Sequence, residues 1–102
     1  MTPIAANDEQ AIHPLIAAIA TDLAVTRLTG PIWKLSERFG SDDDAHTHLA
    51  LLCLVRTGHV EEKWVNGRPI FLRLMTINDH DLRCASHHFE KAVARLADQK
   101  AA

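Results

Sequence analysis

The side chains with the most chemical potential in this chain of 102 residues are its seven histidines and two cysteines. His80, Cys84 and His88 follow one another at intervals of four residues, so on a helix they lie along one side. Imidazole and thiolate are ligands of zinc and copper, which makes this stripe a candidate metal site. One ion cannot reach both ends of so long a span, so a single helix supplies at most two ligands. We therefore expect a solvated or dimer-facing stripe, with no metal or other cofactor bound.

The remaining candidates for chemistry do not form a catalytic group. His46 and His48 are two positions apart, so on a helix they point to nearly opposite sides and cannot chelate one ion. Glu61 and Glu62 would face opposite sides of a strand, which excludes a paired acid and base. The sequence has no phosphate-binding glycine loop, nucleophile elbow or helical His-Glu-x-x-His motif. We therefore predict that the protein is not an enzyme.

Composition favours one globular, cytoplasmic domain. Hydrophobic residues make up 47% of the chain and charged residues 24%, which is typical of a folded domain. No apolar run approaches the ~20 residues that a membrane span needs. The apolar stretch at 15–20 has no basic segment before it, so it does not resemble a secretory signal. Two cysteines are too few for a disulfide scaffold.

The charge of −2 is unevenly distributed along the chain. Residues 1–62 carry nine acidic and four basic side chains, a net of −5, whereas residues 63–102 carry four acidic and seven basic ones, a net of +3. A polyanion would therefore be attracted to the last forty residues rather than to the first sixty-two.

Helix signals divide the first half of the chain into three helices. Residues 1–6 are small and irregular, so we expect a loose end there. The first helix starts either at a cap on Asn7 or with Pro14 as its first residue, and it ends at Gly30-Pro31. A second helix spans residues 31–39. Ser41 is expected to cap a third helix, whose first turn is 42–44 and which Gly58 ends.

After Gly58 the pattern predicts a hairpin and then a last helix. Two alternating segments, 60–65 and 68–74, flank Asn66-Gly67, the residue pair that a type I′ turn requires. Pro69 has no N–H group, so we expect its strand to have one unpaired edge. The last helix spans 78–98 and starts at Asn78 or Asp79. The fold class is thus α+β, mainly helical, with the order α-α-α-β-β-α.

This order resembles the winged helix-turn-helix of ArsR- and MarR-type transcriptional regulators. The resemblance covers about 32–74, and two runs carry it: Thr-Gly-His-Val-Glu at 57–61 and Asn-Gly-Arg-Pro-Ile-Phe-Leu-Arg-Leu at 66–74. It implies one domain at 7–102, with the helix-turn-helix at 31–57, the wing at 59–75 and a C-terminal helix at 78–98. It also implies a bacterial homodimer that binds double-stranded DNA and regulates transcription.

The resemblance assigns DNA contacts to the third helix and to the wing. On the helix the reading positions are His46, Thr47 and His48, followed by Leu49 and Leu52. On the wing the contacting residues are Lys63, Trp64, Asn66 and Arg68. Trp64 has an alternative role, packing across the sheet on Pro69 or Phe71.

The third helix departs from the pattern of these families. It has no basic residue before Arg56, it carries Leu49 and Leu52 at contact positions, and three aspartates at 42–44 would repel phosphates. An alternative therefore stays open, in which Leu49 and Leu52 bind a protein partner and the third helix binds no DNA. A second alternative is a metal-responsive regulator, because some ArsR-type sensors bind metal on their last helix. Cys53, inside an apolar run, is expected to be buried.

Overall fold

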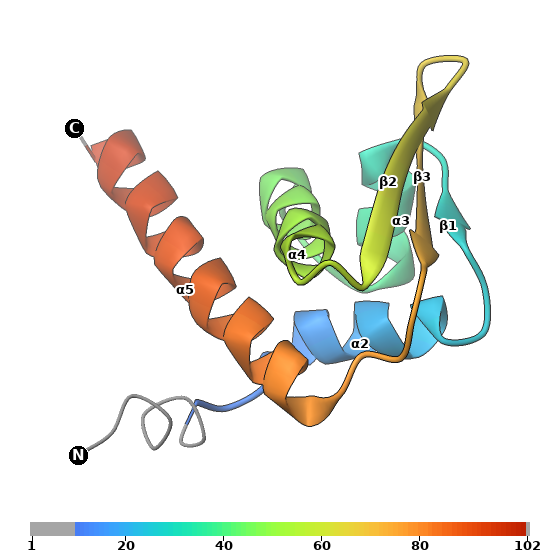
Figure 1. Cartoon of the computed structure of the whole chain (residues 1–102). Helices are drawn as coiled ribbons and strands as arrows, with labels where there is room; N and C mark the ends of the chain where they lie inside the picture. The colour runs from blue at the N-terminus through green and yellow to red at the C-terminus, as the bar shows by residue number, and fades with distance from the viewer. Residues whose placement is uncertain (1–9, 102) are drawn as a thin grey trace.

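Four helices and a three-stranded antiparallel sheet make up the described part of the chain, residues 10–101 of a computed structural model (Figure 1). The α+β class is as predicted. The predicted order lacked one strand. The elements in chain order are α2 (Pro14–Leu23), β1 (Leu28–Thr29), α3 (Ile32–Arg38), α4 (Asp44–Arg56), β2 (Val60–Val65), β3 (Arg68–Arg73) and α5 (Asp79–Ala101).

Helix α2 begins at Pro14, one of its two predicted starts, but it ends earlier than expected. His13 caps it, because its Nδ1 accepts a hydrogen bond from the backbone N–H of Leu15 at 3.1 Å. The helix ends at Leu23 and not at Gly30-Pro31. Asn7, the other predicted start, and the expected loose end at 1–6 lie outside the described residues.

Strand β1 is the element that the sequence did not predict. Leu28 pairs with Phe71 and Thr29 with Ile70, so β1 joins the sheet in the order β1-β3-β2. A strand of two residues is too short to show an alternating pattern. Its pairing with a segment about forty positions away ends α2, because the chain must turn back to reach the sheet.

Helix α4 starts two residues later than predicted, and its cap is Asp43 rather than Ser41. The Oδ1 atom of Asp43 accepts from the backbone N–H groups of Ala45 at 2.8 Å and His46 at 3.3 Å. A carboxylate at this position accepts hydrogen bonds from two otherwise unpaired N–H groups. Its negative charge also interacts favourably with the positive end of the helix dipole. The hydroxyl of Ser41 instead donates to the backbone oxygen of Asp43 at 3.1 Å.

The predicted hairpin is present, with the predicted turn. Asn66 and Gly67 have φ angles of 53° and 77°, the left-handed conformation of a type I′ turn. The expectation for Pro69 needs correction, since β3 is the central strand and pairs on both sides. Pro69 faces Trp64 of β2. In an antiparallel pair, hydrogen-bonded and non-hydrogen-bonded positions alternate, and this one needs no N–H from Pro69 toward β2. On the other side, β1 ends before it reaches Pro69. On the β1 side, β3 is paired at Ile70 and Phe71 and is unpaired at its other residues, Pro69 among them.

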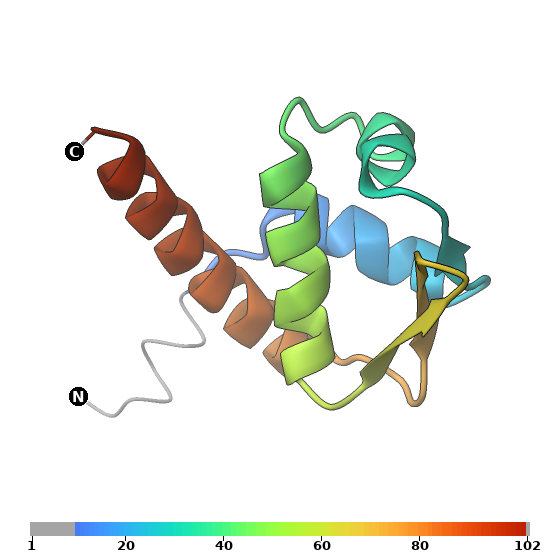
Figure 2. The same cartoon turned by 90° about the horizontal axis from the view of Figure 1, so that it is seen from above.

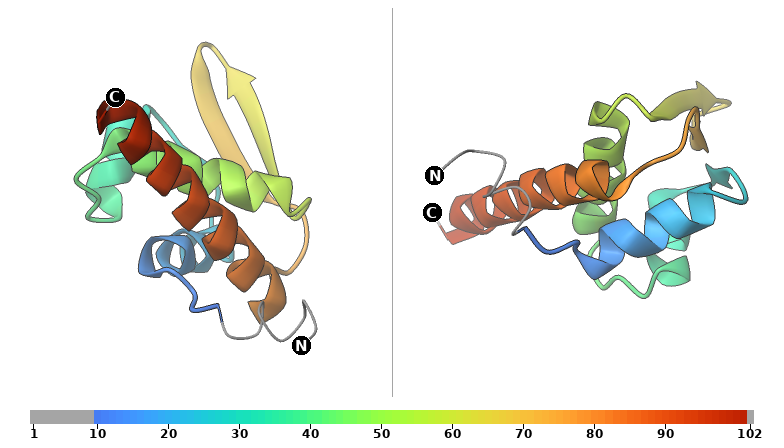
Figure 3. Two further views of the ribbon diagram at one scale, coloured as in Figure 1. Left: turned by 90° about the vertical axis from the view of Figure 1, so that its left-hand side faces the viewer. Right: turned by 60° about the horizontal axis from the view of Figure 1, so that its bottom comes forward.

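Helix α5 has a reciprocal cap and extends beyond the body of the molecule. The Oδ1 of Asn78 accepts from the N–H of Asp81 at 2.9 Å, and the Asp81 carboxylate accepts from the N–H of Asn78 at 3.4 Å. The helix continues three residues past its predicted end. In Figure 2 and in the right-hand view of Figure 3, its first turns lie beside α4, and its C-terminal end projects beyond the other elements. Among residues 10–101, no helix combines the length and the apolar character that crossing a bilayer requires.

The core lies between α2, α4, the inner face of the sheet and the first half of α5. Its largest fully buried apolar side chains are Phe71, Ile16, Ile19, Leu28, Leu51 and Leu54. Phe71 on the central strand is 0% exposed and pairs with Leu28. The sheet is therefore fixed to the helices through its middle strand.

Replacing Phe71 with alanine should lower the free energy of unfolding by about 3–5 kcal/mol, because it removes a fully buried ring and leaves a cavity. Urea unfolding followed by circular dichroism measures this change. Trp64→Ala is the matched aromatic truncation on the same sheet, and it should cost less than about 1 kcal/mol because Trp64 is 60% exposed. Equal losses in the two variants would contradict this placement of the core.

Candidate functional site: the α4–hairpin surface

Thr47, a predicted DNA-reading residue, is buried between α3 and α4. It is 0% exposed, and its Oγ1 accepts from the Oγ of Ser36 at 2.8 Å. The same hydroxyl donates to the backbone oxygen of Asp43 at 3.3 Å. A side chain with both of its hydrogen bonds made inside the protein cannot contact a base. The prediction for Thr47 is therefore corrected: this residue holds the helix pair together.

His46 turns toward α5 rather than outward. Its Nε2 lies 3.7 Å from the Oδ2 of Asp43, and its ring meets Phe89 edge-on, with 6.3 Å between the ring centroids. The structure thus places two of the three predicted reading residues on the sides of α4 that face other helices. His48 is half-buried.

The outward stripe of α4 combines apolar and polar side chains. Since Thr47, Leu51 and Leu54 define the buried face, the opposite face carries Ala45, His48, Leu52 and Arg56. Leu49, beside this stripe, and Leu52 are half-buried, and both face a groove next to α5. The stripe has an aspartate, Asp44, at its start and one cation at its end. Such a surface suits a protein partner better than a row of phosphates.

The hairpin tip carries the exposed candidates. Asn66 and Arg68 are exposed at the turn, and Trp64 lies next to it with 60% of its surface open, opposite Pro69. Figure 1 shows the tip projecting beyond the helices. Lys63 is also exposed, but its Nζ pairs with the Oε1 of Glu61 at 3.2 Å on the same face of β2. The tip therefore offers an amide, a flat apolar ring and a guanidinium that forms no ion pair with the other described residues.

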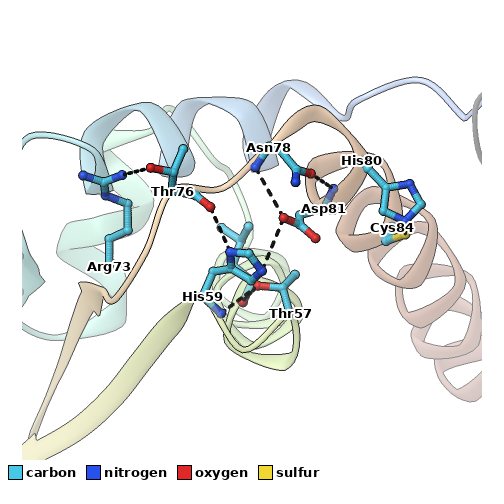
Figure 4. Close-up of polar contacts among 9 residues, drawn as sticks. Thr57, His59, Arg73, Thr76, Asn78, His80, Asp81 and Cys84 are labelled. Atoms are coloured by element: carbon cyan, nitrogen blue, oxygen red, sulfur yellow. Dashed lines mark hydrogen bonds and ion pairs between the residues drawn. The ribbon is translucent and has the colours of Figure 1, made fainter.

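A cluster at the base of the hairpin, which we call the base clasp, consists of His59, Thr76 and Asp81 (Figure 4). The Nδ1 of His59 lies 2.9 Å from the backbone oxygen of Thr76, and its Nε2 lies 3.4 Å from the Oδ2 of Asp81. Both partners are acceptors, so the ring donates to both only in its protonated form. Arg73 supports the loop by donating to the hydroxyl of Thr76 at 3.3 Å.

The base clasp joins both ends of the hairpin to the first turn of α5. His59 precedes β2, Thr76 follows β3, and Asp81 is part of the α5 cap. Sequence reasoning missed this cluster, although the Asn78–Asp81 spacing gave a partial signal for the cap. The clasp orients the hairpin relative to the helices, so it is a positioning element for whatever the tip contacts.

The histidine and cysteine stripe on α5 does not assemble a metal centre. The Sγ of Cys84 lies 3.7 Å from the Nε2 of His80, a contact between two neighbours on one helix. Within residues 10–101, no three histidine, cysteine or acidic side chains come together as a metal would require. Cys53 is buried, as predicted. Burial raises the pKa of its thiol, and the nearby Arg56 charge offsets part of that rise.

The two thiols should therefore react at different rates. A raised pKa leaves Cys53 with less thiolate at any given pH, and burial limits access to it, so iodoacetamide at about pH 8 should label Cys84 first. Mass spectrometry of the peptides measures the two rates. In urea both sites should react alike. Equal rates in the folded protein would contradict the buried position of Cys53.

His59→Ala should lower the free energy of unfolding by about 1 kcal/mol, because it removes the half-buried contacts of the base clasp. The matched control is His88→Ala, since His88 is exposed on α5 and forms no hydrogen bond or ion pair with the other described residues. Urea unfolding at about pH 6 compares the two variants. A loss no larger in His59→Ala than in His88→Ala would show that the clasp does not stabilise the fold.

Comparison with known proteins gives no further assignment of this surface. No family model, no curated protein and no solved structure matches the chain. The interpretation of the α4–hairpin surface therefore depends on its own residues and their geometry.

Proposed function

We propose that the chain is a winged-helix domain of a bacterial, cytoplasmic transcriptional regulator, and that it binds duplex DNA mainly through its wing. The observation that carries this proposal is the hairpin that directly follows the α3–α4 pair and exposes Asn66 and Arg68 at its tip. A guanidinium at such a position donates to phosphates at the edge of a groove. The strand β1 before α3 pairs with β3 and gives the hairpin a third strand as support.

In this mode the wing contributes more than α4 does. Arg68 contacts the phosphate backbone, and Asn66 and Trp64 contact the groove edge. On α4 the outward residues His48 and Arg56 are the ones placed to approach DNA, because Thr47 is buried and His46 faces α5. The exposed carboxylates of Asp42 and Asp44 keep the start of α4 away from phosphates. Binding is therefore dominated by phosphate contacts and depends weakly on sequence.

The same proposal includes a homodimer. A cleft of about 790 Å³ lies between α2 and α5, and its apolar lining includes Leu15, Phe39, Phe89 and Val93. The second half of α5 leaves Val93 half-covered beside this cleft. A two-fold pairing of copies through the cleft would cover this lining and present two wings to one duplex.

Arg68→Ala should weaken binding to all duplex sequences alike. A fluorescence titration of a random duplex at several salt concentrations should show a slope reduced by about one for this variant. Lys34→Ala is the matched control, since Lys34 is an exposed cation on α3, away from the tip. No binding by the unmodified protein at low salt, or no change in Arg68→Ala, would overturn the proposal.

A protein-interaction module is the second candidate function. The specific observation in its favour is Leu52, a half-buried apolar side chain on the outward stripe of α4, which has a carboxylate at its start. If the protein ignores DNA at low salt while Leu52→Asp abolishes binding to a protein partner, this second function replaces the first.

A further inference from the structure

A groove runs between α4 and the second half of α5, on the side of α5 opposite to the cleft described above. Its volume is about 470 Å³. The part of its lining that matters here comprises Leu49, Leu52 and Arg56 from α4 and Lys91, Arg95 and Leu96 from α5. Figures 1 and 2 show that the ribbons of the two helices diverge toward the C-terminal end of α5. We call it the α4–α5 groove.

The walls of the groove have helical spacing on both sides. Leu49, Leu52 and Arg56 are three and four residues apart, which places them on one face of α4 over two turns. Lys91 and Arg95 are four residues apart on α5. Two helices that diverge with side chains at this spacing leave a channel that fits the ridge of a third helix.

Beyond Phe89, the second half of α5 has no buried side chain among the described residues. Val93, which packs against the core, and Leu96 are half-buried there. The helix is about 35 Å long at 1.5 Å per residue. A helical segment that leaves the core gains little stability on its own, because most helix stability comes from packing an apolar face.

The charged side chains that line the groove are all basic, which indicates the charge of the helix that would bind there. Arg56, Lys91 and Arg95 form its rim, and among the described residues no carboxylate lines it. Within the described residues, none of these three cations takes part in an ion pair. The floor is apolar, with Leu49, Leu52 and Leu96. An apolar floor with a cationic rim matches an amphipathic helix whose polar flanks are acidic.

Other occupants match less well. The phosphates of duplex DNA would pair with the cations of the rim. The leucines of the floor would then lie against a polar surface. A second copy placing its α5 here about a two-fold axis would bring Lys91 and Arg95 close to the same residues of the other chain. We propose that the α4–α5 groove binds an acidic amphipathic helix of a partner protein. This site is separate from the hairpin tip. It rests on the second candidate function, whose Leu52 it contains, and it shares Arg56 with the α4 face of the DNA-binding proposal.

The test uses two synthetic peptides of eighteen residues with the same leucine face, one flanked by glutamates and the other by lysines. Fluorescence anisotropy with the full chain at low salt should show the glutamate peptide binding about tenfold more tightly, as expected for three exposed charge pairs. The double variant Lys91→Glu with Arg95→Glu should reverse this preference. Both residues are exposed, so the fold should persist, and circular dichroism checks this.

Lys34→Glu is the matched control, because it changes the same charge outside the groove and should leave the preference unchanged. Leu52→Asp should weaken the binding of both peptides. Four outcomes would overturn the proposal: no binding of either peptide, equal binding of both, displacement of the glutamate peptide by duplex DNA, or self-association of the chain that Arg95→Glu abolishes. The third outcome would assign the groove to nucleic acid, and the fourth to a second copy.

Discussion

The buried hydrogen bond between Ser36 and Thr47 fixes how α3 and α4 meet, and the functional surface depends on that arrangement. Both hydroxyls are excluded from water, and each needs a partner to offset the loss of solvation. They find each other, and Thr47 also donates to Asp43, the residue that caps α4. One buried polar link therefore sets both the rotation of α4 about its axis and the place where it begins.

That rotation decides which side chains α4 presents to the solvent. With Thr47 turned inward, the opposite face carries Ala45, His48, Leu52 and Arg56, and His46 is brought against Phe89. Cations are thus scarce on the face that a DNA-reading helix would use. The exposed cation at the hairpin tip lies on a different element. The hairpin tip and α4 therefore have different chemical characters, which is why we propose phosphate contact for the first and a protein partner for the groove beside the second.

Elements with strong local signals could be predicted from the sequence. The hairpin follows from Asn66-Gly67, because few other residue pairs tolerate two positive φ angles in succession. The last helix follows from the Asn78 cap and its apolar spacing. By contrast, β1 has two residues, and its existence depends on a partner strand about forty positions away. No local pattern contains that information.

The exposed face of α4 could not be predicted for a different reason. Its sequence is apolar nearly all round from Leu49 to Val55, so spacing alone does not say which side is covered. The deciding contacts come from Ser36 on α3 and Phe89 on α5, which are distant in the chain. The base clasp is of the same kind, since His59 and Asp81 meet across the whole hairpin.

The base clasp and the α4–α5 groove are formed by different parts of α5. Its first turn is joined to the hairpin through Asp81, and its second half forms one wall of the α4–α5 groove. Because α5 is one continuous helix, the residues that hold the hairpin and those that line the groove belong to one element. The Asp81 carboxylate contacts His59 at the base of the hairpin, and Arg95, further along the same helix, lies on the rim of the groove. The orientation of α5 that the base clasp fixes therefore also sets the position of the groove wall.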